Sequence, residues 1–177
     1  MTNYNFEQMR RNEIKTCISF IDDAYKRNLG ESAHAFQSKK LTDPPWSWFN
    51  TRGIYYFTLK SSNRIIGYSI WRIVKDVSHL HSFLVVADFQ KKGIGSILLK
   101  YYEEKSMQLE PNINIFTLHT YKETKYTYIF YNKNGYKKYK RNDENIVDGL
   151  DTWTKNCKKY DDWPLKGNKV LFYKSTQ

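Results

Sequence analysis

Residues 80–102, Leu-His-Ser-Phe-Leu-Val-Val-Ala-Asp-Phe-Gln-Lys-Lys-Gly-Ile-Gly-Ser-Ile-Leu-Leu-Lys-Tyr-Tyr, form the stretch that decides the fold. Its apolar run at 83–86 has the length and β-branched content of a buried strand. A basic turn with two glycines follows at 90–95, and apolar positions then recur at helical spacing. A helix start offers free N–H groups and a positive dipole end, and glycines let a phosphate approach the backbone. The stretch therefore predicts a strand, a turn and a helix suited to holding an anion, with Lys91 and Lys92 adding charge.

The segments around this stretch predict a mixed α/β fold. A β-hairpin is expected at 54–59 and 65–74, where Gly67 indicates a bulge or a close backbone approach. A strand at 113–119 follows the helix, so it should pair in parallel with the strand at 83–86. The other expected elements are an edge strand at 4–6, helices at 11–28, at 32–40 and after Thr124, a proline break at 43–49, and strands at 136–140 and 170–173.

Length and composition favour one folded domain over residues 1–177, with an insertion at 141–168. The chain is 40% hydrophobic and 17% aromatic, which is ample for a core. No apolar run approaches the ~20 residues that span a bilayer, and the first residues contain no signal-peptide core. We therefore expect a cytoplasmic protein with no membrane association. Cys17 and Cys157 predict ordinary thiols, and metal-ligand spacing is absent, so no metal is expected.

The net charge of +11 favours a polyanionic partner, which could be nucleic acid, a membrane surface or a phosphate-rich cofactor. Two nucleotide sites are excluded by their motifs. A dinucleotide fingerprint needs a third glycine where Leu98 stands, and the antiparallel strands before the turn differ from a βαβ unit. The chain has no Gly-x-x-x-x-Gly-Lys-Ser/Thr, so a P-loop is excluded as well.

Two motifs at this point resemble the GCN5-related N-acetyltransferase (GNAT) superfamily. The first is Gln90-Lys91-Lys92-Gly93-Ile94-Gly95 after an apolar strand, and the second is Tyr131-Asn132-Lys133-Asn134-Gly135-Tyr136. The similarity covers roughly residues 54–140. It implies a GNAT-like fold, in which helices flank a mostly antiparallel sheet whose one parallel pair is splayed at the acetyl-coenzyme A site.

The resemblance implies acetyl-CoA as the acetyl donor. In that family the strand backbone, here around Leu84 and Val85, pairs with the pantetheine arm, and the turn amides hold the pyrophosphate. Gly93 and Gly95 independently allow a tight turn beside a phosphate. The cofactor-binding residues carried over in this way are Leu84, Val85, Gln90, Lys91, Lys92, Gly93, Ile94, Gly95, Ser96 and Thr124. Thr124 stands where many family members have an asparagine.

Tyr131 matches the family's general acid, which protonates the departing coenzyme A thiolate. A phenol with a reference pKa near ~10 stays protonated at neutral pH, as this role requires. The glutamate that often relays a proton from the amine is missing. His79 and His81 alternate onto one sheet face instead, and His81 or a water chain could serve as the base. His119 is a weaker candidate.

The acceptor is expected to be a small-molecule or peptide amine that enters between residues 30–50 and 141–168. Trp46 and Trp48 either line its pocket or close one end of the core. A small amine, a polyamine, an antibiotic, a protein N-terminus and a lysine all remain open. The chain is expected to be a monomer or a homodimer that binds no nucleic acid. The alternative is a non-catalytic module that binds RNA or senses acyl-CoA, since basic charge and many tyrosines suit stacking and phosphate contacts.

Overall fold

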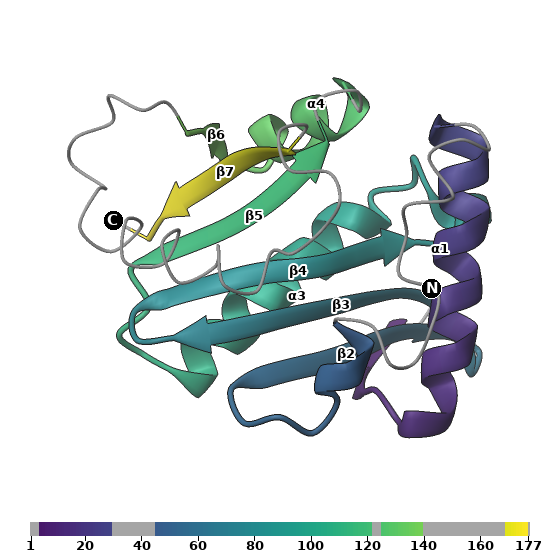
Figure 1. The fold of residues 1–177 in the computed structure, drawn as a ribbon. Coiled ribbons are helices and arrows are strands. Elements are labelled where there is room, and N and C mark those ends of the chain that lie inside the picture. Colours follow the sequence, from purple (N-terminus) through teal and green to yellow (C-terminus); the bar gives the residue numbers. More distant parts are fainter. Residues whose placement is uncertain (1–3, 30–44, 122–124, 140–168, 177) are drawn as a thin grey trace.

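A single mixed sheet organises the computed structural model, which describes residues 4–29, 45–121, 125–139 and 169–176 (Figure 1). The described part contains seven strands in the order β1-β2-β3-β4-β5-β7-β6. Only the β4–β5 pair is parallel. The strands are β1 (Tyr4–Gln8), β2 (Ile54–Ser61), β3 (Arg64–Val74), β4 (Val77–Val85), β5 (Ile115–Tyr121), β6 (Lys137–Lys138) and β7 (Lys169–Ser175). The predicted fold class is confirmed.

In the described part of the chain, three α-helices and three short 3-10 turns surround this sheet. The α-helices are α1 (Ile14–Leu29), α3 (Ile94–Leu109) and α4 (Lys125–Lys133). The 3-10 turns are η1 (Arg11–Glu13), η2 (Trp46–Trp48) and η3 (Ala87–Phe89). The proline break predicted at 43–49 thus contains one short 3-10 turn. The helix predicted at 32–40 and the insertion at 141–168 lie outside the described residues.

The β2–β3 hairpin forms as predicted. Its turn residues Ser62 and Asn63 have φ angles of 48° and 64°, the left-handed geometry of the tightest hairpin turns. Gly67 lies where the β2–β3 register shifts, and a Cβ added there would meet the Leu84 carbonyl oxygen at 2.9 Å. Both expectations for Gly67, a bulge and a close backbone approach, are therefore met.

The parallel pair differs from its prediction in register. β5 pairs with residues 77–80 of β4 rather than with 83–86, because the ladder ends at Leu80 and Leu118. On the other side of β4, Trp71 pairs with Leu80 and Ile70 with Ser82, which leaves His81 as the extra residue of a bulge. A bulge bends and twists its strand. β4 and β5 consequently lie side by side at first and then diverge towards α4 (Figure 1).

The sheet has a core on each face. On one face, α3 packs against Trp71, Leu80 and Phe116. On the other, α1 packs against Tyr68 and Ile70 with its buried side chains Ile14, Cys17, Ile18 and Ile21. Ile97 fits the apolar spacing of this helix but lies on its outer side, where it is 41% exposed. The buried side of α3 consists of Ile94, Leu98, Leu99, Tyr102 and Ser106.

The C-terminal strand β7 inserts between β5 and β6. It pairs antiparallel with β5 along Ile115–Tyr121 and with the two residues of β6. The strand predicted at 136–140 is therefore reduced to Lys137–Lys138 within the described part of the chain. Because β7 fills this place, β5 has a partner along its whole length on the side away from β4.

Candidate active site

The turn between β4 and α3 presents backbone N–H groups at its surface. Lys91 and Gly93 have φ angles of 59° and 79°, so the chain reverses sharply before α3. The hydrogen bonds of α3 begin with the Ile97 N–H and the Gly93 carbonyl at 3.2 Å. The N–H groups of residues 94–96 precede that bond, and the first turn of a helix offers them no acceptor. With Lys91 and Lys92 exposed beside them, these donors have the geometry and charge that suit an anionic group.

The Gln90 side chain stabilises this turn by a hydrogen bond. Its side-chain Nε2 donates a hydrogen bond of 2.8 Å to the carbonyl oxygen of Val85, the last residue of β4. The predicted cofactor-binding side chain therefore lies against its own strand. The neighbouring Phe89 ring has Lys92 Nζ at 5.7 Å and the Arg64 guanidinium at 5.9 Å from its centroid, which is within the range of a cation–π contact.

Gly95 is required for packing as well as for the turn. A Cβ added there would meet the Phe130 ring of α4 at 3.0 Å, tighter than ordinary van der Waals contact. The helix that begins at the turn therefore touches the helix that carries Tyr131. Sequence reasoning missed Phe130, and its position directly before Tyr131 was the only available signal.

The second half of β4 offers an open edge beside this turn. Val85 still pairs with Gly67 of β3, whereas β5 stops pairing at Leu80. The Leu84 side chain is buried towards α1, and the Val85 side chain is buried beside Ile94. Within the described residues, the backbone of 81–85 therefore has no strand on its β5 side, and an extended ligand could pair there.

The second motif is a helix C-cap. The Tyr136 N–H donates to the Tyr131 carbonyl at 3.0 Å, and the Gly135 N–H donates to the Asn132 carbonyl at 3.1 Å. Gly135 has a φ of 87°, so this is a Schellman motif, and the rings of its first and last residues, Tyr131 and Tyr136, lie 5.8 Å apart. The spacing Tyr-x-x-x-Gly-Tyr is thus the spacing at which a helix end brings these two side chains together.

Tyr131 lies in the core on the α3 side, with 8% of its surface exposed. Its ring contacts Phe130 at 5.1 Å and Phe172 of β7 at 6.0 Å. Burial raises the pKa of Tyr131, and the nearby Tyr126 hydroxyl raises it further. The phenol is therefore held in its protonated form well above neutral pH, as a proton donor requires.

Three histidines meet on the opposite sheet face, where β4 and β5 diverge. His79 and His81 of β4 have ring centroids 4.7 Å apart, and His119 of β5 lies 5.1 Å from His79. His79 is buried, and its Nδ1 lies 2.8 Å from Thr117 Oγ1. The predicted sharing of one face by His79 and His81 is confirmed, and Thr117 is an addition that no sequence signal indicated. Within the described residues, no group of His, Cys, Asp or Glu is arranged to hold a metal ion.

The two predicted acceptor-site tryptophans have different surroundings. Trp46 is 2% exposed and packs in the α1-side core, 5.6 Å from the Tyr68 ring, so it closes the core. The Trp48 ring meets His81 edge-on at 5.2 Å, so it lies at the place where the strands diverge. The structure thus brings Trp48 and His81 together. Thr124 lies outside the described residues.

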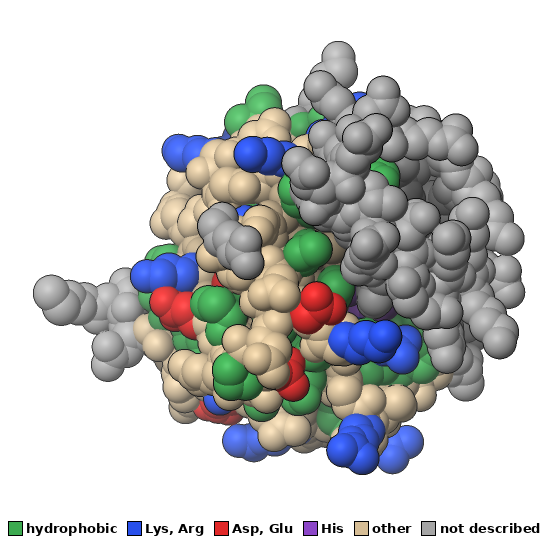
Figure 2. Space-filling model, turned by 90° about the vertical axis from the view of Figure 1, so that its left-hand side faces the viewer, with side chains coloured by type: hydrophobic (Ala, Val, Ile, Leu, Met, Phe, Trp, Pro, Cys, Tyr) green, Lys and Arg blue, Asp and Glu red, His purple; other side chains and the backbone are tan. Residues whose placement is uncertain are grey.

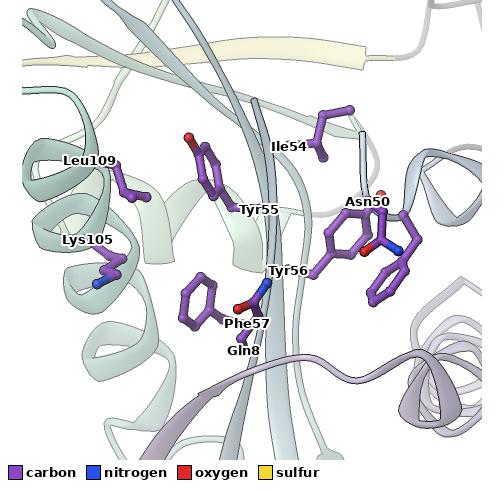
Figure 3. Close-up of a pocket in the computed structure, with 9 residues that line it drawn as sticks. Gln8, Asn50, Ile54, Tyr55, Tyr56, Phe57, Lys105 and Leu109 are labelled. Atoms are coloured by element: carbon purple, nitrogen blue, oxygen red, sulfur yellow. The ribbon is translucent and has the colours of Figure 1, made fainter. Parts of the chain in front are cut away.

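A pocket of about 430 Å³ lies elsewhere, at the outer edge of β2 (Figure 3). Tyr55 and Phe57 face Lys105 and Leu109 of α3, and Tyr56 and Asn50 lie across the strand. The other lining residues are Gln8, Phe49 and Ile54. Lys105 is ten residues along α3 from Gly95, about 15 Å at the helical rise, so this pocket is not the anion site.

Comparisons with known proteins identify the family to which these features belong. A model of the Acetyltransferase (GNAT) family matches residues 20–136. The ribosomal protein bS18-alanine N-acetyltransferase of Salmonella typhimurium is 33% identical over 78 residues, which cover 41% of this chain and 47% of that protein. The match therefore spans about half of that relative.

Solved structures show the same fold. The PaiA N-acetyltransferase of Thermoplasma acidophilum, in complex with coenzyme A, superposes with a TM-score of 0.71 at 14% identity, covering 98% of this chain and 99% of that one. A GNAT-family acetyltransferase of Staphylococcus aureus gives 0.71 at 18% identity, covering 99% and 100%. This chain belongs to the acetyltransferase (GNAT) family, whose enzymes take the acetyl group from acetyl-CoA.

Proposed function

We propose that the protein transfers the acetyl group of acetyl-CoA directly to a primary amine while both substrates are bound. One observation carries this proposal: where β4 and β5 diverge, a buried tyrosine lies on one sheet face and histidines on the other. Tyr131 belongs to the α3-side core, whereas His81 touches Trp48 near α1. A proton donor and a proton acceptor thus flank the open β4 edge.

The described residues fit coenzyme A. The N–H groups of residues 91–96 would hold the pyrophosphate, with Lys91 and Lys92 offsetting its charge. The open backbone of 81–85 would pair with the amides of the pantetheine arm. In this arrangement the thioester lies near His81, where the strands begin to separate.

The proposed reaction needs two proton transfers. The neutral amine nitrogen attacks the thioester carbonyl carbon, and collapse of the tetrahedral intermediate forms the amide and breaks the carbon–sulfur bond. His81 accepts the proton that the amine loses, directly or through water. Tyr131 gives its phenolic proton to the departing sulfur. His81 then releases its proton to solvent, and a proton from solvent restores the phenol. The products are the N-acetylated amine and free coenzyme A.

For the acceptor, we propose a peptide with an N-terminal alanine as the first candidate, since the relative from Salmonella typhimurium carries that activity in its name. The other open acceptors, including polyamines and lysine side chains, belong in the same screen. Release of free thiol from acetyl-CoA reports transfer to any of them. The class of amine that increases the rate of thiol release from acetyl-CoA would be identified as the substrate.

The alternative RNA-binding function predicts a concentrated basic surface. On the face in Figure 2, lysine and arginine side chains lie apart, with acidic and hydrophobic side chains between them. This face therefore does not carry the concentrated basic surface that the RNA-binding alternative predicts. None of the helices in the described part of the chain has the length and apolar character needed to cross a bilayer.

Replacement of Tyr131 with phenylalanine tests the proposal. Tyr131→Phe keeps the ring contacts but removes the donated proton, so kcat should fall about 100-fold while the Kd of acetyl-CoA changes less than twofold. Calorimetry measures the Kd, and thiol release measures kcat. Tyr55→Phe, in the separate pocket at the edge of β2, is the matched control. An unchanged kcat in Tyr131→Phe would reassign Tyr131 to packing.

A further inference from the structure

A largely buried ion pair joins two segments next to the Tyr131 turn, and the proposed chemistry leaves it unused. Glu103 of α3 and Lys174 of β7 lie 71 residues apart, with Nζ and Oε2 separated by 2.7 Å. The Glu103 side chain is only 12% exposed and that of Lys174 is 32% exposed. Removing such a carboxylate from water is costly, so its retention calls for an explanation.

Tyr136 lies against this pair. Lys174 Nζ is 5.6 Å from its ring centroid, and the aliphatic part of Lys174 lies beside Gly135. Burial, followed by the Tyr102 hydroxyl and the Glu103 carboxylate, raises the pKa of Tyr136. Glu103 Oε1 and the Tyr136 hydroxyl are nevertheless buried without a hydrogen bond of standard geometry to any described residue. A buried donor and a buried acceptor therefore face each other beside the cap of α4.

The helix cap connects Tyr136 to Tyr131, so the position of one residue constrains the position of the other. The Tyr136 N–H holds the Tyr131 carbonyl at 3.0 Å, and the two rings are in edge contact. Tyr131 is the third-last residue of α4, so a movement of the cap directly moves the Tyr131 side chain. The ionisable side chains around this turn are Tyr102 and Glu103 from α3, Tyr126 from α4, and Lys174 from β7.

We infer that Glu103, held by Lys174, is a positioning residue for Tyr131: it fixes Tyr136 and, through the helix cap, the Tyr131 phenol. This inference rests on the proposed function for its effect on catalysis. The contact itself does not depend on that function. A misplacement on the order of 1 Å can cost up to ~100-fold in rate, so a buried anchor here has a direct kinetic effect.

A double-mutant cycle tests the inference. Glu103→Gln keeps the shape but removes the charge that holds Lys174, and we expect a roughly 10-fold lower kcat with less than a twofold change in the KM of acetyl-CoA. In a Tyr131→Phe background, the same change should have no further effect on kcat, because the group it positions is gone. An equal loss in both backgrounds would overturn the inference. Glu104→Gln is the matched control, since Glu104 is exposed and pairs only loosely with Lys100 at 3.5 Å.

A second measurement does not need an acceptor. In protein labelled with [¹³Cζ]tyrosine, the Tyr131 resonance, assigned from the Tyr131→Phe spectrum, should move in Glu103→Gln and stay in place in Glu104→Gln. An unmoved Tyr131 resonance would refute the inference even if no amine were ever acetylated. If the wild-type protein acetylated no amine but the Tyr131 resonance still moved in Glu103→Gln, the proposed function would be refuted and the inference would stand. Should Glu103→Gln not fold, Tyr136→Phe removes the facing hydroxyl with little change in volume and gives the same tests.

Discussion

The donor turn and the acceptor face of the candidate active site are built in different ways. The turn from Gln90 to Ser96 is one continuous segment, and its N–H groups follow from its own φ angles and the start of α3. The acceptor face instead combines His81 of β4, His119 of β5 and Trp48 of η2, which are distant in sequence. A locally encoded site can be broken by strain at one residue, whereas an assembled site depends on the register of the sheet.

The largest effect is expected from a substitution in the proposed acceptor face. His81→Gln removes the proposed base and should lower kcat/KM about 100-fold at neutral pH, with the Kd of acetyl-CoA unchanged. Steady-state kinetics and calorimetry measure the two quantities. Because imidazole titrates near neutrality, the acidic limb of the rate profile should also disappear. An unaltered rate profile would remove His81 from the mechanism and leave a water chain as the route for the proton.

A smaller effect is expected from a substitution in the proposed donor turn. Gly93→Ala forces a non-glycine residue to adopt a φ of 79°, which costs about 1–2 kcal/mol, although its Cβ would meet no atom within 4 Å. The displaced N–H groups should weaken acetyl-CoA binding about tenfold.

Gly53→Ala is the matched control, because Gly53 also has a φ of 79° but lies before β2, away from the turn. Thermal unfolding should show similar destabilisation for both variants, and calorimetry a weaker Kd for Gly93→Ala alone. Equal Kd values in the two variants would show that the turn does not hold the donor.

The smallest effect concerns a cluster of ion pairs that stabilises the fold. Lys60 Nζ contacts Glu7 at 2.6 Å and Glu13 at 2.7 Å, which ties β1 and η1 to β2. The hydrogen bond from Lys60 lowers the pKa of Glu7, and those with Glu13 and Glu7 raise the pKa of Lys60. A lowered carboxyl pKa contributes stability above its unfolded value, and this contribution is lost as pH falls through the folded value.

Wild-type protein should therefore unfold at a higher temperature than Lys60→Met at pH 7, and the difference should shrink below about pH 4, where carboxylates become protonated. Unfolding followed by circular dichroism over this range measures it. Lys100→Met, which removes an exposed partner, is the control with little expected difference at any pH. If the difference in unfolding temperature between wild type and Lys60→Met stayed constant with pH, the effect of Lys60 would be assigned to packing.

Much of the donor site could be predicted because its signals are local. The strand, the turn and the helix follow in one stretch, and the Tyr131–Tyr136 spacing is a helix cap whose glycine needs a positive φ. The apolar spacing along the chain did not specify which side of α3 is buried. Only packing against the sheet buries Leu99 and exposes Ile97.

The sequence by itself determined the fold class and the family, and it predicted the turn between β4 and α3, because each motif, strand and helix is a pattern of residues close together in the chain. Tertiary structure decided where β5 stops pairing, since the bulge at His81 arises from the register with β3. It also decided that His79, His119 and Thr117 meet, and that Glu103 lies beneath the Tyr131 cap. Contacts across strands and between α3 and β7 depend on register and packing, which no spacing along the chain specifies.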